Sequence, residues 1–194
     1  MVLIVSVCVI AVSSIYYNYK FVRYDSEKIV FGATYMTMNN PYFVNMDENI
    51  EESVQAKGDI LITRDALQDQ KKQNEQIKDM INEGIDVLFL QPVDRNKVRP
   101  ALELCKKKHI PVVVIDSEVS DTEAVVSTIV SDNYDAGVQC AKDMMKKKTS
   151  ANIIIVNQKA LNSINERVKC FRDTIKGHPQ YKIVEEKESA AEFE

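Results

Sequence analysis

The sequence is poor in the residues that build catalytic and nucleotide sites. Its 194 residues include two histidines, five glycines and no tryptophan. Neither of the glycine-rich loops that cradle nucleotide phosphates, G-x-G-x-x-G and G-x-x-x-x-G-K-[ST], occurs. His109 and His178 both lie where a helix is expected to lead into a strand, so neither is placed as a base beside a nucleophile. The composition therefore argues against an enzyme, and we expect no cofactor.

Cysteine and basic residues exclude further classes of site. Cys8, Cys105, Cys140 and Cys170 show neither C-x-x-C nor Cys/His spacing, so no metal site is expected. The last three fall on the apolar stripes of separate predicted helices, which predicts buried free thiols. A net charge of −4 argues against nucleic acid as a partner, because a phosphate backbone requires a concentrated basic face. The run Lys146–Lys148 is instead expected to close a helix, where cations meet the negative end of the helix dipole.

One long hydrophobic run stands at the N-terminus. Met1–Tyr17 carries no charge, and Lys20 and Arg23 follow it. The run is slightly short of the ~20 residues that span a bilayer, but it is longer than a usual buried strand, which is the alternative. A cleaved signal peptide would need a basic start, which is missing. We therefore predict an uncleaved signal anchor at residues 1–19 and a linker at 20–27, with the rest of the chain on the extracytoplasmic side of the cell membrane.

From Lys28 onward, short apolar segments alternate with amphipathic ones. Asn40 is expected to cap a helix that has Pro41 as its first residue, and Gly84 is expected to stop another. This alternation predicts an α/β fold in which parallel sheets are flanked by helices. Right-handed crossovers bring the C-terminal ends of such strands to one edge, where ligands bind. The expected strands are 28–36, 59–64, 85–90, 111–116, 125–130, 152–156 and 181–184.

Neutral amides, carboxylates, an arginine and aromatic rings gather directly after the predicted strands. This mixture suits a polyol, whose hydroxyls need donors and acceptors and whose C–H face packs on an aromatic ring. Each charge-assisted hydrogen bond contributes ~1.5–3 kcal/mol, so several are enough for capture. The candidate ligand-binding residues are Asn40, Tyr42, Phe43, Asp116, Asn133 and Arg167.

Each candidate also has a purely structural interpretation. Asn40 is a suitable helix cap, and the two aromatic residues after it are suited to hold the start of the helix. Asp116 is placed to cap a turn. Arg167 follows a capping-box pattern that runs from Ser163 to Glu166, and it is placed to pair with that glutamate in solvent.

Four segments, in this order and at these separations, resemble the periplasmic sugar-binding proteins of the ribose/galactose type and the ligand-binding cores of lactose-repressor-like regulators. The resemblance runs from about Lys28 to the end of the chain. It implies a two-lobed periplasmic-binding-protein-like fold, with a first lobe at 28–132 and the beginning of a second, C-terminally incomplete lobe at 133–194. The four segments are Thr37–Phe43 (TMNNPYF), Ile110–Asp116 (IPVVVID), Val130–Asn133 (VSDN) and Asn165–Arg167 (NER).

The resemblance also assigns places to the candidate residues. It implies that Asn40, Tyr42, Phe43 and Asp116 face the cleft from the first lobe and Arg167 from the second. Asn133 would lie at the first hinge.

Two departures from the family pattern argue against ribose itself as the ligand. Ribose binders carry Asp-Arg where this chain has Asp116-Ser117, and usually an arginine where it has Asn165.

The resemblance implies a substrate-binding protein that captures a sugar or similar polar small molecule for the permease of an ABC-type importer. A membrane-anchored co-receptor that senses sugar for a sensor kinase is one alternative, and a cytosolic regulator or enzyme with the same fold is another. A repressor would need a basic helix-turn-helix before Lys28, where the hydrophobic run lies instead. We expect weak or absent ligand binding by the 194-residue chain alone.

Overall fold

The computed structural model describes residues 28–189. The predicted signal anchor and linker, residues 1–27, lie outside this range. Within it, none of the helices combines the length and the apolar character that crossing a bilayer requires. The elements are β1 (Val30–Tyr35), α2 (Pro41–Gln55), β2 (Ile60–Asp65), α3 (Gln70–Glu83), β3 (Val87–Leu90), α4 (Arg99–Lys107), β4 (Val112–Ile115), β5 (Val125–Ile129), α5 (Asn133–Lys147), β6 (Ala151–Asn157), α6 (Asn162–Ile175) and β7 (Tyr181–Glu188).

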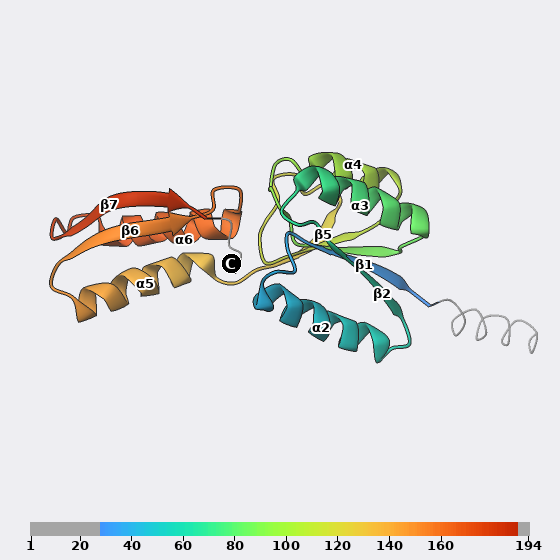
Figure 1. The fold of residues 1–194 in the computed structure, drawn as a ribbon, viewed down its shortest axis with the longest axis horizontal. Helices are drawn as coiled ribbons and strands as arrows, with labels where there is room; N and C mark the ends of the chain where they lie inside the picture. Colours follow the sequence, from blue (N-terminus) through green and yellow to red (C-terminus); the bar gives the residue numbers. More distant parts are fainter. Residues whose placement is uncertain (1–27, 190–194) are drawn as a thin grey trace, which may run out of the picture.

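The first five strands form one parallel sheet in the order β2-β1-β3-β4-β5. Helix α2 covers one face of this sheet, and α3 and α4 cover the other (Figure 1). We call β1–β5 with α2–α4 the first unit. The α/β class predicted from the alternation of segments is confirmed, and all five strand ends meet at one edge.

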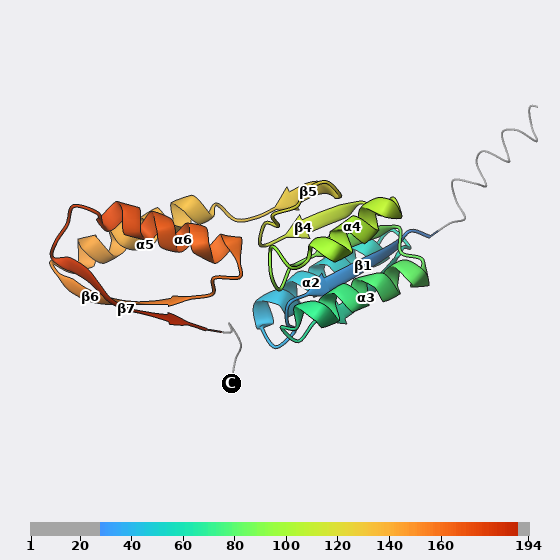
Figure 2. The ribbon, with the colours of Figure 1, turned by 90° about the horizontal axis from the view of Figure 1, so that it is seen from above.

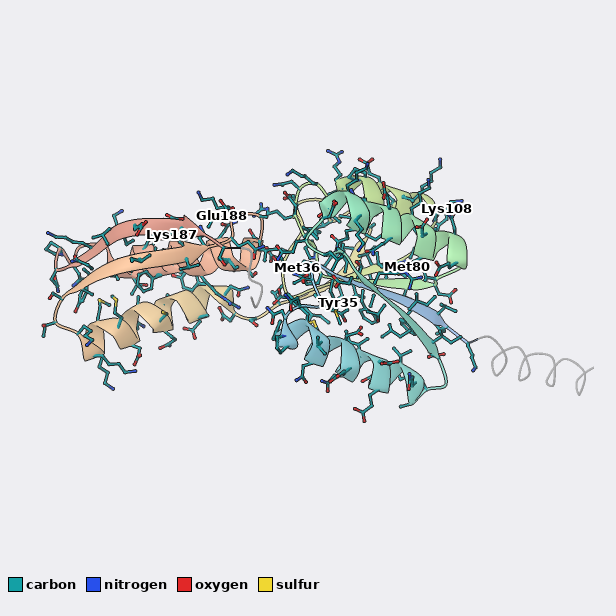
Figure 3. The ribbon with its side chains drawn as sticks, in the orientation of Figure 1. Tyr35, Met36, Met80, Lys108, Lys187 and Glu188 are labelled. Carbon is teal, nitrogen blue, oxygen red and sulfur yellow. The ribbon has the colours of Figure 1, made fainter. Side chains whose placement is uncertain are left out.

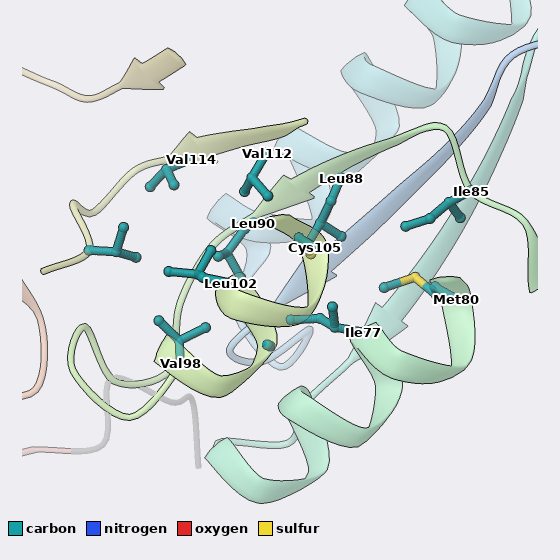
Figure 4. Close-up of a cluster of buried hydrophobic side chains, with 12 residues drawn as sticks. Ile77, Met80, Ile85, Leu88, Leu90, Val98, Leu102, Cys105, Val112 and Val114 are labelled. Carbon is teal, nitrogen blue, oxygen red and sulfur yellow. The ribbon is translucent and has the colours of Figure 1, made fainter. Parts of the chain in front are cut away.

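A hydrophobic cluster holds α3 and α4 against the sheet. Ile77 and Met80 of α3 and Leu102 of α4 belong to this cluster, together with strand residues such as Leu88 and Val112 (Figure 4). Each of these five side chains is at most 1% exposed. This layer buries apolar surface from two helices and two strands at once, and this burial stabilises the first unit.

A second cluster fills the space between the sheet and α2, and it reaches the end of the sheet. Tyr35 and Met36 lie at that end, beside the second half of the molecule (Figure 3). Both are fully buried, and Phe43 of α2 is 5% exposed. Leu161, which precedes α6, is 3% exposed and belongs to the same cluster, so it packs across from the other half of the chain.

The helix ends follow the cap chemistry of the sequence. Asn40 has an extended backbone and its Oδ1 accepts from the Tyr42 amide at 3.0 Å, with Pro41 at the first helical position, which confirms the predicted start of α2. Asp69 caps α3 by accepting from the amides of Lys71 and Lys72. Gly84 ends α3 with φ +91°, a left-handed conformation that favours glycine.

The remaining elements form a smaller second unit, which consists of β6, β7, α5 and α6. The two strands pair in parallel, and both helices lie on the same side of them (Figure 2). Ala141 and Tyr181 are buried between helices and strands. The outer face of this sheet leaves three large apolar side chains more than half exposed, those of Ile154, Val156 and Val184.

Helix α4 begins at Arg99, after a turn in which Asp94 accepts from the amides of Asn96 and Lys97. Two local expectations were wrong. Strand β7 runs to Glu188, beyond its expected end at residue 184, because pairing with β6 continues to that residue. Cys140 is exposed, since its side of α5 is not covered, whereas Cys105 and Cys170 are buried free thiols as predicted.

Leu102→Ala should lower the free energy of unfolding by about 2–5 kcal/mol, because it opens a cavity in the cluster between α3, α4 and the sheet. Chemical denaturation of both variants would measure this. Leu67→Ala removes the same atoms from a side chain that is 60% exposed and is the matched control, with an expected change of less than about 0.5 kcal/mol. Equal losses in the two variants would contradict the assigned core.

Candidate functional site

The C-terminal edge of the first sheet faces the N-terminal end of α6. A single connection, residues 130–132, joins the two units along the chain. Non-covalent contacts also cross between them: the Arg95 amide donates to the Ala160 carbonyl at 3.3 Å, and the Asn162 side-chain amide donates to Glu118 at 2.6 Å. Residues from both units therefore meet at this edge, which is where a ligand site is expected in an open parallel sheet.

Asp116 lies directly after β4 in a tight turn. Its φ is +66°, a left-handed conformation that aspartate tolerates better than most residues. Its amide donates to the Ile129 carbonyl at 2.9 Å, and the Ser117 amide donates to the Ile115 carbonyl at 2.8 Å. Backbone in this region is held in place by its surroundings and is common at binding sites. The turn orients the Asp116 carboxylate over the sheet edge.

The carboxylate of Asp116 is partly shielded from solvent. Burial raises the pKa of its carboxyl group, and this outweighs the effects of the Arg167 guanidinium and of the nearby Tyr42 and Gln91 side chains, which lower it. Burial and the neighbouring Asp116 charge also raise the pKa of the Tyr42 hydroxyl. The carboxylate thus has a cation nearby but retains a net cost of desolvation, as expected for an acceptor that awaits further donors.

Arg167 is held by the other helix of its own unit. Its Nε donates to the Asn133 Oδ1 at 2.7 Å, and Asn133, the first residue of α5, is only 4% exposed. The helices cross so closely here that a Cβ on Gly137 would lie 2.3 Å from the Arg167 carbonyl oxygen. The glycine therefore permits the crossing that places Arg167. Its side chain bonds to α5 and not to the adjacent Glu166.

The two aromatic candidates differ in access. Tyr42 is 52% exposed, and its hydroxyl is close enough to Asp116 for that charge to raise its pKa. Phe43 is 5% exposed and packs edge-on against Tyr42, with ring centroids 5.4 Å apart, and at a tilt against Tyr35. Of the two rings, Tyr42 is the accessible one in this arrangement. Phe43 is part of the core beneath it.

The remaining candidates serve mainly as supports. Asn40 caps α2 with its side-chain oxygen, so its structural interpretation is correct. Asn133, expected at a hinge, directly follows the connection at 130–132, and as the first residue of α5 it accepts from Arg167.

Two glutamines that follow strands were not selected from the sequence. Gln91, after β3, is fully buried, and its Oε1 accepts from the Met36 amide at 2.7 Å. Its Nε2 lies near Asp116 but has no partner in hydrogen-bonding geometry. Gln158, after β6, is 8% exposed and its Oε1 is likewise unpaired. The signal was available, because an amide that follows a strand is as suited to a polyol as a carboxylate is.

A polar hollow of about 700 Å³ lies between the two units. Asp94 and Lys97 line it from the loops of the first unit, and Gln158 and Glu188 line it from the ends of β6 and β7. None of the six candidate residues lines this hollow, so it is separate from the candidate site.

Comparison with known proteins agrees with this geometry. Residues 31–193 match the family model described as the periplasmic binding protein domain. The ribose import binding protein of Bacillus subtilis is 31% identical over 117 residues, which cover 60% of this chain and 38% of that protein. The chain thus spans less than half the length of this curated relative.

Solved structures of periplasmic binding proteins share the fold of this chain. An ABC transporter solute-binding protein from Mycobacterium smegmatis with bound glycerol superposes with a TM-score of 0.77 at 28% identity, covering 82% of this chain and 56% of that one. The fructose-binding periplasmic domain of a hybrid two-component system shares the fold, with a TM-score of 0.76 at 22% identity, covering 84% of this chain and 55% of that one. On the family match and the shared fold, this chain belongs to the periplasmic binding protein family.

Proposed function

We propose that this protein is an extracytoplasmic substrate-binding protein that captures a sugar or similar polyol for the permease of an ABC-type importer. The observation that carries the proposal is the convergence of three groups of different chemistry from two units. Asp116 supplies an acceptor, Arg167 a donor, and Tyr42 a half-exposed ring beside them. The names of a relative, a ribose import binding protein, and of a solved structure, an ABC transporter solute-binding protein with glycerol, support the same class of ligand.

Each residue has a role in this proposal. Asp116 accepts from ligand hydroxyls, Arg167 donates to ligand oxygens, and the Tyr42 ring packs on the C–H face. Phe43 supports Tyr42 from below. Of the other two candidates, Asn133 orients the arginine, and Asn40 fixes the start of the helix that carries the ring. Three or four such bonds at ~1.5–3 kcal/mol each approach the roughly 8 kcal/mol of micromolar binding.

The arrangement of the chain follows from the same proposal. Residues 28–132 would form the first lobe and 133–194 would belong to the second, with 130–132 as the connection that flexes. The proposed signal anchor at 1–19 would hold both on the outer side of the cell membrane. The mixed set of acceptors and donors fits polyols in general, and the identity of Ser117 and Asn165 points away from ribose.

A sensory role is the second candidate. The fructose-binding periplasmic domain of a hybrid two-component system shares this fold, so the same fold occurs in signalling proteins. Detergent extraction of the tagged full chain, followed by mass spectrometry of co-purified membrane proteins, separates the two. A permease would support import, and a sensor kinase would support sensing.

Ligand capture can be tested on the chain by NMR titration with ribose, arabinose, fructose, xylitol and myo-inositol. We expect at least one to shift the amides of Tyr42, Asp116 and Arg167, with a dissociation constant roughly in the millimolar range, near −4 kcal/mol, because a single donor and acceptor pair spans the site. Glu103→Gln, on the exposed side of α4, is the control and should leave the titration unchanged. Shifts that appeared only at amides away from Tyr42, Asp116 and Arg167 would contradict the proposed site.

Asp116→Asn should weaken this binding and at the same time stabilise the unliganded protein at neutral pH. The folded-state pKa of Asp116 lies above its ordinary 3.8, so the stability that the protonated group contributes is present below pH 3.8 and is lost as the pH rises through the raised value. The asparagine side chain of the variant does not ionise, so the variant does not lose this stability as the pH rises. In thermal denaturation from pH 3 to 8, the melting temperature of the variant should increase relative to that of the parent protein as the pH rises.

The control for this pH series is Asp143→Asn, which changes an exposed carboxylate paired with Lys147 on α5. Its melting temperature should not increase relative to that of the parent protein as the pH rises. A constant difference between Asp116→Asn and the parent at all pH values would contradict the assigned burial of Asp116.

A further inference from the structure

Strand β6 forms an open edge of the sheet in the second unit (Figure 2). Within residues 28–189 this sheet has two strands, and β6 pairs in parallel with β7 alone. The Asn157 carbonyl accepts from the Ser189 amide at 2.8 Å, so Asn157 turns its backbone groups toward β7. Successive residues of a strand turn these groups to opposite sides. Those of Asn152, Ile154 and Val156 therefore point to the open edge.

The open edge of β6 lacks the features that usually prevent pairing with another chain. Such features are charged side chains, prolines and bulges. The seven residues of β6, ANIIIVN, include no charge and no proline. The register shift between the two strands places the extra residue, Val184, on β7 and leaves β6 regular. Strand β7 is the protected edge, since it carries five charged residues, Lys182, Glu185, Glu186, Lys187 and Glu188.

The surface on either side of the β6 edge is apolar. On the outer face of the sheet, Ile154 is 56% exposed and Val156 is 64% exposed. A groove of about 410 Å³ lies between β6 and the two helices, and side chains such as Ile155, Met144 and Phe171 line it. Unpaired backbone groups flanked by exposed apolar side chains favour association with another strand.

The sequence of β6 is complementary to a second copy of itself. A twofold axis beside the open edge would pair two copies of the strand antiparallel. With the axis beside Ile154, that residue lies opposite its own copy, Asn152 lies opposite Val156, and Ile153 lies opposite Ile155. No like charges then meet across the junction, and apolar side chains lie opposite one another on both faces of the sheet.

We propose that two copies of this chain associate through the open edges of β6, which pair antiparallel and join the two sheets into one. The strand order of the joined sheet is β7-β6-β6-β7. Pairing supplies partners for the backbone groups of Asn152, Ile154 and Val156. It also converts a two-stranded sheet, which is marginal by itself, into one with enough strands to be stable. This inference goes beyond the proposed function and does not depend on it.

The first experiment measures the oligomeric state of the full chain by analytical ultracentrifugation in detergent micelles. We expect the parent protein to form a dimer. Ile154→Lys places two ammonium groups opposite each other at the axis, so it should weaken dimerisation by roughly tenfold or more. Val184→Lys is the matched control. Its side chain is 57% exposed on the same outer face but belongs to β7, so the dissociation constant should be unchanged.

The second experiment follows hydrogen exchange of the Ile154 amide by NMR. In the dimer this amide has a partner, so its exchange should be slow, and it should accelerate as dilution separates the copies. Ile154→Pro is a second variant in case the lysine variant does not fold. It removes only an N–H group that points away from β7, so it should abolish the dimer and leave the pairing of β6 with β7 intact.

Three results would overturn the proposal. The first is a monomeric parent protein. The second is equal weakening of the dimer by Ile154→Lys and Val184→Lys, which would show that the outer faces stack instead of the edges pairing. The third is slow exchange of the Ile154 amide in the monomer, which would show that another segment of the same chain covers the edge. No sugar is used, so each of these results leaves the proposed function untouched.

Discussion

Parallel pairing of β1 with β2 on one side and β3 on the other is the constraint on which the rest of this protein depends. Parallel strands can be joined only by crossovers, and the helices in those crossovers cover both faces of the sheet. The same geometry sends every strand end to one edge. Asp116, Gln91 and the start of α2 lie together there for that reason, although they come from different parts of the chain.

This arrangement is energetically unfavourable for Asp116. Its carboxylate is desolvated at the sheet edge, and the turn that presents it has a left-handed backbone. Arg167 and Tyr42 offset part of the desolvation but not all of it. A group that is incompletely satisfied in the unliganded protein gains most when a hydroxylated ligand supplies the missing donors. The partial burial of Asp116 is therefore consistent with a binding role and has no benefit for stability.

The elements of the fold were largely predictable because they depend on local signals. Asn40 with Pro41, and Gly84 after a polar helix, mark helix ends by chemistry that acts within a few residues. Expectations failed where a longer contact took over. Pairing with β6 extends β7 to Glu188, and the packing of Leu161 into the first unit displaces the cap that the pattern at Ser163 suggested.

The candidate site was predictable in kind but not in detail. Strand-end position identified Asp116, Tyr42 and Arg167, yet the same rule passed over Gln91, because the pattern does not show which strand-end amides point toward the carboxylate. The rule also could not tell that the Tyr42 ring is accessible and the Phe43 ring is buried. Adjacent residues at a helix start point in different directions, and only packing against Tyr35 shows that Phe43 lies inside.

By itself, then, the sequence determined the α/β class, the parallel strands and the edge where polar residues gather, since periodicity and cap chemistry are local properties. Only the tertiary structure decided that Arg167 bonds to Asn133, that Gln91 lies near Asp116, and that Ser117 caps a helix 45 residues away. Each of these contacts joins residues that are distant in the chain, and the contact of Ser117 also crosses between the two units. No local pattern in the chain encodes them, because they result from the packing of many distant residues.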